Sequence, residues 1–148
     1  MRGINVSRML IGGIVAGVLC WVGDGVVHGV LLKDWWQAVM AGLGRNAGDV
    51  GMRSPIYFVL YDLAKGLVGV WLYAAIRPRF GPGPRTAVLA ALATWALVIP
   101  IPLCGLIPME WFGRKFALAW SLYGLVPVLI GVLVGSWLYR EGTATEAR

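Results

Sequence analysis

Four long apolar stretches constrain the fold of this chain more than any other feature of its sequence. They cover residues 9–32, 55–76, 86–107 and 116–139, and the last two contain no charged residue. A bilayer core about 30 Å thick is crossed by about 20 apolar helical residues. Each stretch is long enough to span a membrane as a helix. The sequence therefore predicts an all-α membrane protein with four transmembrane helices, arranged as two hairpins.

The composition excludes the main alternatives to this fold. Apolar residues make up 59% of the 148 residues, and charged residues only 14%. A soluble domain is usually about 45–50% apolar. The strands of a membrane β-barrel would alternate in polarity over roughly ten residues, whereas these stretches are continuous. Residues 1–148 are therefore expected to form a single transmembrane domain.

The first apolar stretch is expected to stay in the protein as an uncleaved helix. A signal peptide has an apolar core of only about 7–15 residues, followed by a cleavage site with small residues. Here the apolar run continues to Leu32, and the Leu19 before Cys20 does not fit a lipoprotein cleavage site.

Basic residues beside the spans indicate the orientation, because Lys and Arg are enriched on the cytoplasmic side. The side with both termini and the second connection has Arg2, Arg8, Arg77, Arg79, Arg85, Arg140 and Arg148, and the other has Lys33, Arg45, Arg53, Arg114 and Lys115. The short connection over residues 77–85 holds three arginines and no acid. We expect a bacterial inner-membrane protein with both termini in the cytoplasm. The net charge of +6 then reflects topology and anionic headgroups, not nucleic-acid binding.

The first connection predicts a short amphipathic helix over residues 34–44. Apolar residues recur there at helical spacing, namely Trp35, Trp36, Val39, Met40 and Leu43. Tryptophan favours the membrane interface, and a helix with one apolar face lies along it. The segment is either a connector that rests on the membrane or a lid or docking element.

Two stretches 66 residues apart resemble each other. Tyr57, Gly69, Trp71, Leu72 and Tyr73 are matched by Tyr123, Gly135, Trp137, Leu138 and Tyr139. Both stretches belong to spans that run in the same direction. The pattern indicates a possible parallel repeat of two hairpins, related by a pseudo-twofold axis along the membrane normal. Aromatic residues at membrane interfaces would make any two span ends look alike, and this is the alternative.

Glycines four residues apart are expected to pack helices together. The pairs are Gly13 with Gly17, Gly25 with Gly29, and Gly131 with Gly135. Small residues at this spacing let helix backbones approach closely in lipid. Most of these pairs are expected to act inside the fold, and one could serve a dimer or a larger complex.

Ionisable residues inside the predicted spans mark the candidate site. Asp24 and His28 are four apart on one face of the first span, and Asp62 and Lys65 are three apart on the second. At a rise of about 1.5 Å per residue, Asp24, Asp62 and Lys65 fall in one layer of the membrane. We expect Lys65 to pair with Asp24, Asp62 or both. The cluster is either a structural lock between two helices or a polar site for a proton or small solute.

Other chemistry is sparse in this sequence. His28 is the only histidine, and it could supply one axial ligand to a haem or a chlorophyll-type pigment or serve as a packing residue. No cluster of several metal ligands and no nucleophile with a matching base is evident, so we expect neither a metal site nor an enzyme. A membrane enzyme that uses Asp24 and His28 stays open. Cys20 and Cys104 lie at different depths, so we expect no disulfide.

Several segments resemble a family of small four-helix bacterial integral membrane proteins with no established function. The segments are residues 8–17, 29–32 with Trp36, 41–44 and, most specifically, 71–84. The resemblance covers most of the chain. It implies that an acid belongs at position 24, where the relatives often carry Glu. It also implies that His28 is particular to this chain, because Asn often stands there.

The functional prediction is a non-enzymatic membrane subunit or scaffold, which packs in a homo-oligomer or a larger membrane complex. Its partners are the lipid bilayer and other membrane proteins, and no nucleic acid is expected. The alternative is a small-solute or proton-coupled transporter with Asp24, Asp62 and Lys65 as its polar site. A lesser alternative is a haem- or pigment-associated subunit that uses His28.

Overall fold

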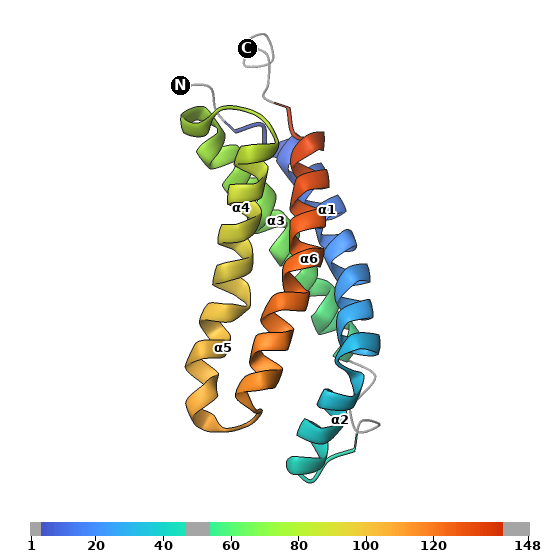
Figure 1. Cartoon of the computed structure of the whole chain (residues 1–148). Coiled ribbons are helices and arrows are strands. Elements are labelled where there is room, and N and C mark those ends of the chain that lie inside the picture. Colours follow the sequence, from blue (N-terminus) through green and yellow to red (C-terminus); the bar gives the residue numbers. More distant parts are fainter. Residues whose placement is uncertain (1–3, 47–53, 141–148) are drawn as a thin grey trace.

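The computed structural model describes residues 4–46 and 54–140, and four membrane-spanning segments pack side by side in it as a helical bundle (Figure 1). The segments are α1 (Val6–Val26) with the π-helix η1 (Val27–Leu31), α3 (Ser54–Phe80), α4 (Pro84–Val98) with α5 (Pro100–Leu106) and η3 (Ile107–Met109), and α6 (Arg114–Leu138). Together with the short helix α2 (Lys33–Gly42), they confirm the predicted all-α membrane fold. Arg2, Arg53 and Arg148, which entered the topology argument, lie outside the described residues.

The two ends of the bundle differ in what they carry. The start of α1, the turn between α3 and α4 and the end of α6 meet at one end, here called the α3–α4 end (Figure 1). The opposite end, here called the α2 end, carries α2 and the connection from α5 to α6 (Figure 1). This arrangement agrees with the predicted topology, in which the second connection lies on the same side as both termini.

The connection between α3 and α4 is shorter than predicted. The second span was expected to end at residue 76, but α3 continues to Phe80, so only residues 81–83 connect the two helices. Pro78 lies in the last turn of α3, where its missing N–H removes only one hydrogen bond at the helix end. Gly81 then ends the helix in a left-handed conformation with φ +83°, and its N–H donates to the Arg77 carbonyl at 2.9 Å.

The third span is broken near the α2 end. Helix α4 stops at Val98, and α5 begins with Pro100 in its first turn. A proline disfavours helical geometry in the residue before it, and Ile99 accordingly has φ −122° and ψ −77°. The break leaves backbone carbonyls without helical donors, and one of them contributes to the site described below.

The first span ends in a π-helix that the sequence did not reveal. Residues 27–31 form a five-residue segment of this rare geometry, and the Leu32 N–H donates to the Val27 carbonyl at 2.8 Å. Helix α2 follows directly, close to the predicted range of 34–44. On α2, Trp36 and Val39 pack against the cluster of Val27, Leu32 and Phe116, and the rings of Trp36 and Phe116 meet edge-on. The amphipathic helix is thus attached to the bundle.

Four of the six predicted packing glycines lie where helices touch. A Cβ on Gly13 or Gly17 would come within 3 Å of the α3 backbone, and one on Gly131 or Gly135 would meet backbone oxygens of α1 at 2.7 and 2.4 Å. The closest approach involves Gly66 of α3. A Cβ there would lie 2.1 Å from the Gly17 nitrogen. These glycines bring α1 into backbone contact with α3 and α6.

Gly25 and Gly29 do not pack inside the fold, so for this pair the predicted role in a dimer or a larger complex stays a prediction. Both glycines are exposed, and nothing lies within 4 Å of a Cβ built at either position. Each directly follows a residue that faces into the bundle, Asp24 or His28. The next residue along a helix points in a direction turned by roughly a quarter of a turn, so Gly25 and Gly29 face outward.

Two tyrosines at the α3–α4 end support the predicted repeat. Tyr73 accepts a hydrogen bond from the N–H of Gly83, the N-cap of α4, and Tyr139 accepts one from the N–H of Asn5, the N-cap of α1; both measure 3.3 Å. Their rings meet edge-on with centroids 6.0 Å apart. Counted from these caps, buried small residues of α1 match buried residues of α4, namely Gly12, Gly13 and Ala16 with Ala90, Ala91 and Thr94.

Candidate polar site between α1 and α3

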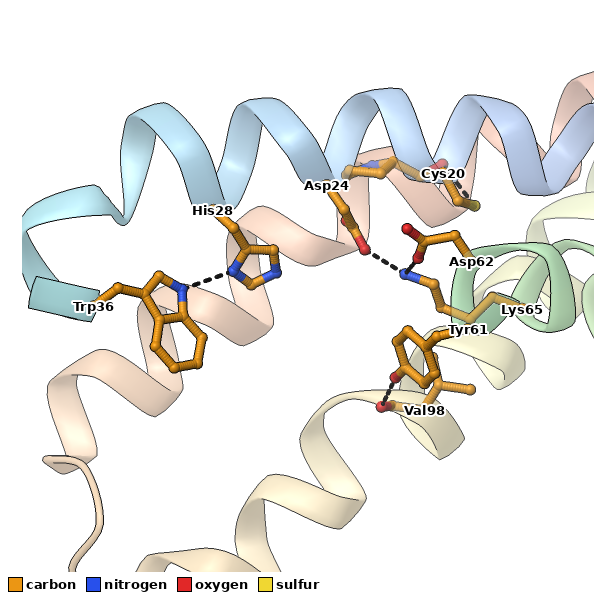
Figure 2. Close-up of polar contacts among 9 residues, drawn as sticks. Cys20, Asp24, His28, Trp36, Tyr61, Asp62, Lys65 and Val98 are labelled. Carbon is orange, nitrogen blue, oxygen red and sulfur yellow. Dashed lines mark hydrogen bonds and ion pairs between the residues drawn. The ribbon is translucent and has the colours of Figure 1, made fainter. Parts of the chain in front are cut away.

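A buried three-residue cluster joins α1 to α3 near the middle of the bundle. The Lys65 ammonium of α3 contacts the Asp24 carboxylate of α1 and, at 2.6 Å, the Asp62 carboxylate of its own helix (Figure 2). The side chains of Lys65, Asp62 and Asp24 are 1%, 4% and 13% exposed. The structure thus confirms the predicted pairing of Lys65, which contacts both Asp24 and Asp62.

The sequence around Lys65 explains how this cluster forms. Asp62 and Lys65 are three residues apart, so they share the face of α3 that turns toward α1. Gly66 continues that face and lets the two backbones touch. The short distance between the helices brings Asp24 within reach of Lys65, so that the glycine contact and the ion pairs depend on each other.

Protic side chains around the cluster donate their hydrogen bonds elsewhere. The Tyr61 hydroxyl donates to the Val98 carbonyl at 2.9 Å, while its ring lies 4.9 Å from the Lys65 ammonium (Figure 2). That carbonyl lacks its usual helical donor because Pro102, four residues later, has no N–H. The Cys20 thiol donates to the carbonyl of Pro127 in α6 at 3.6 Å. The Tyr61 hydroxyl and the Cys20 thiol therefore donate to backbone carbonyls and not to the carboxylates, which are contacted by Lys65.

The cluster contains one more acid than base. Two carboxylates share a single ammonium, so the three ionised groups together carry one negative charge. Among the residues that the structure describes, the buried Asp24 Oδ1 accepts no hydrogen bond. A buried charge or acceptor without a partner is costly in a protein interior. The one carboxylate in excess of the ammonium therefore needs an explanation.

His28 is not part of this cluster, although it shares a helix face with Asp24. The indole N–H of Trp36 donates to His28 Nδ1 at 2.9 Å (Figure 2). The imidazole ring also meets the Trp120 ring edge-on, with centroids 5.2 Å apart. His28 therefore belongs to an aromatic cluster that fixes α2 against α6. Trp36 was predicted as a membrane anchor, but its hydrogen bond to His28 has no signature in the sequence.

This hydrogen bond gives no support to a haem or pigment ligated by His28. An imidazole whose Nδ1 accepts a hydrogen bond carries its own proton on Nε2, so neither nitrogen has a free lone pair. Histidines that bind metals show the opposite pattern, because they donate their second N–H to an acceptor. Ligation by His28 stays a prediction, and it would require the bond to Trp36 to break.

Two shallow cavities lie at the α2 end, away from the charged cluster. One, of about 350 Å³, is formed by α2 and residues 110–113, and the other, of about 440 Å³, by residues 107–114. Glu110 borders both and has a left-handed backbone with φ 55°.

Cys20 is buried and Cys104 exposed, and both are free thiols. Within residues 4–46 and 54–140, no group of His, Cys, Asp and Glu is arranged to hold a metal ion.

Comparisons with known proteins give this chain no relative. No family model matches it, and neither a curated protein nor a solved structure is significantly similar. The resemblance stated above therefore stays a prediction. Any functional argument depends on the geometry of this molecule.

Proposed function

We propose that this protein is a non-enzymatic subunit or scaffold of a bacterial inner membrane, with both termini in the cytoplasm. The closed state of its polar cluster is the observation that carries this proposal. Lys65 is 1% exposed at its side chain and already contacts two carboxylates, so no solute can reach its ammonium in this arrangement. A cluster of this kind holds helices together, and the protein then acts through its outer surface.

The outward face of the first span, over the end of α1 and over η1, is the best surface for such an association. Gly25 and Gly29 leave an open strip on it, bordered by the exposed Val22 and Val26. Small residues four apart let a second helix approach closely in lipid, where the hydrophobic effect does not drive association. We propose that this strip contacts a second copy of the chain or a helix of a larger membrane complex.

Gentle purification from native membranes, with mass spectrometry of the co-purifying proteins, tests this function. We expect the wild-type protein to be recovered as an oligomer or with a membrane partner. The double variant Gly25→Leu/Gly29→Leu should lose that association. Gly105→Leu is the matched control, because Gly105 is also an exposed helical glycine with nothing within 4 Å of an added Cβ. A wild-type protein recovered as a monomer without partners would contradict the proposal.

The excess carboxylate favours one alternative, a proton-coupled or small-solute transporter. Such a carrier must open a water-filled path to Asp24 and Lys65. In a background without native cysteines, Asp24→Cys and Lys65→Cys should resist a water-soluble thiol reagent if the protein is a subunit, whereas exposed Gln37→Cys on α2 should react. Labelling at the two cluster positions, together with solute-driven flux into proteoliposomes, would favour the carrier.

A further inference from the structure

The excess carboxylate leads to an inference beyond the proposed subunit role. We propose that the cluster of Asp24, Asp62 and Lys65 is a proton-binding site, in which its two carboxyl groups share one bound proton while Lys65 stays charged. The inference requires neither transport nor a membrane partner. It would hold for a subunit and for a carrier alike.

Charge balance is the first argument for this proton. Lys65 forms ion pairs with Asp24 and Asp62, and all three side chains are largely or fully buried. A net charge in a membrane interior is costly, and such sites are neutralised by pairing or by binding a proton. One ammonium neutralises one carboxylate, and one proton neutralises the other.

The surroundings offer no other compensation for the second carboxylate. The titratable side chains that interact electrostatically with the cluster are Cys20 and His28 from the first span and Tyr61 from α3. Cys20 and Tyr61 donate to backbone carbonyls of α6 and α4, and His28 accepts from Trp36. The helices around the site therefore contribute only backbone carbonyls, or side chains whose hydrogen bonds go to other partners. None of these groups compensates the charge of the second carboxylate. Within the part of the chain that the structure describes, no further ion pair to these carboxylates exists beyond that of Lys65.

The geometry favours a proton over a metal cation. Both carboxylates contact the same ammonium, so the two contacting oxygens are less than about 6 Å apart, the sum of two ordinary charge-assisted hydrogen-bond lengths. A hard cation needs several oxygen ligands and would have to lie beside the Lys65 ammonium, which repels it. A proton needs one carboxyl oxygen, and the buried Asp24 Oδ1 has no hydrogen-bond partner among the described residues.

The chemistry of this step is simple protonation. A hydronium ion transfers its proton to one carboxylate oxygen: one O–H bond of the hydronium breaks, an O–H bond to the carboxyl group forms, and a water molecule is released. Asp24 is the most exposed member of the cluster at 13%, so the proton enters through its side chain. The bound proton then lies between α1 and α3, where it stabilises their contact.

Infrared spectroscopy of the full-length protein in lipid nanodiscs at neutral pH tests the site. We expect a carbonyl stretching band of a protonated carboxyl group, which shifts to lower frequency in deuterated water. Asp24→Asn and Asp62→Asn should each abolish the band, because each leaves a balanced pair of one acid and one ammonium. The control Asp34→Asn changes an exposed acid on α2 and should keep the band.

Three outcomes would overturn the proposal. The first is a wild-type spectrum without the band at neutral pH, a result that needs no variant to fold. The second is a band that persists in both folded Asn variants. The third is a band that appears only when sodium is replaced by choline, because a metal cation would then occupy the site. None of these results depends on whether the protein co-purifies with a partner, so the subunit proposal fails or succeeds independently.

Discussion

The two helical hairpins of this protein build similar halves of the bundle from different residues. At a separation of 66 residues, Asp62 and Lys65 of α3 correspond to Val128 and Gly131 of α6, and all four are buried. The second hairpin therefore closes the equivalent level of the bundle without ions. Buried ion pairs are often replaceable by well-packed apolar residues at no cost in stability. The comparison teaches that this architecture does not require charges at this level: the first hairpin joins its helices with ion pairs where the second uses apolar packing.

The hairpins also differ in how closely their helices approach. Gly66 of α3 lies against the α1 backbone, whereas the corresponding residue of α6 is Val132, a buried side chain in the core. The first hairpin therefore combines the closest backbone contact with the charged cluster. The second combines ordinary side-chain packing with a helix break before Pro100. Mutations that make one hairpin resemble the other should show which of these features carries stability.

Removal of the ammonium should have the largest effect. Lys65→Met leaves two buried carboxyl groups without the ammonium that pairs with both, and we expect a loss of about 3–5 kcal/mol in the free energy of unfolding. The measurement is unfolding in detergent micelles, followed by circular dichroism.

The controls for this prediction separate charge from side-chain size. Lys115→Met, at an exposed position of α6, should change the free energy of unfolding by less than about 0.5 kcal/mol. Lys65→Met/Asp24→Asn/Asp62→Asn copies the neutral second hairpin and should recover most of the loss. If the triple variant and Lys65→Met unfold alike, the loss in Lys65→Met does not come from the carboxyl groups that it leaves without their ammonium.

A methyl group at the closest backbone contact should have the next largest effect. In Gly66→Ala the new Cβ would lie 2.1 Å from the Gly17 nitrogen and 2.4 Å from the Gly13 oxygen. Backbone atoms cannot move aside as a side chain can, so we expect a loss near the upper end of overpacking, about 3 kcal/mol. Gly25→Ala meets nothing within 4 Å and should be neutral or slightly stabilising in the same unfolding assay. Equal free energies of unfolding in both variants would mean that the close contact at Gly66 contributes no stability, because helix propensity favours alanine at both positions.

The aromatic cluster connects the two hairpins, and its disruption should have a smaller and local effect. Trp36→Phe removes the donor to His28 while the ring stays against Phe116 and Trp120. We expect a loss of about 1–1.5 kcal/mol, the usual net value of one hydrogen bond. Hydrogen exchange measured by mass spectrometry should show faster exchange in α2 and unchanged exchange in α1 and α3. Trp111→Phe, at an exposed tryptophan, is the control, and faster exchange throughout the bundle would contradict a local role.

Much of this structure could be predicted from periodicity and polarity alone. The four spans follow from uninterrupted apolar runs, and α2 follows from the spacing of Trp36, Val39 and their neighbours. The pairing of Lys65 follows from depth, because rise per residue fixes the layer in which a spanning side chain lies. Asp24, Asp62 and Lys65 were therefore identifiable as one cluster before any coordinates were known.

The remaining features depend on which way each helix face turns, and spacing alone does not reveal this. Gly25 and Gly29 have the same spacing as Gly13 and Gly17, yet they point outward because the inward face of α1 is set by its contacts with α3 and α6. The π-helix at residues 27–31 and the bond from Trp36 to His28 arise from tertiary packing. Local sequence does not encode either of them.

The smallest expected effect tests the repeat itself. Tyr73→Phe and Tyr139→Phe each remove a hydroxyl that accepts one backbone N–H at a helix cap, while the ring contact between the two residues is kept. The predicted pseudo-twofold axis would make the two hydrogen bonds equivalent, and they are equally long. We therefore expect equal losses of about 0.5–1 kcal/mol in the unfolding assay. Tyr57→Phe, at an exposed tyrosine of α3, should lose nothing. Clearly unequal losses would mean that Tyr73 and Tyr139 resemble each other only in position, as aromatic residues at membrane interfaces do. The two tyrosine hydrogen bonds would then not contribute equally to the stability of the two hairpins.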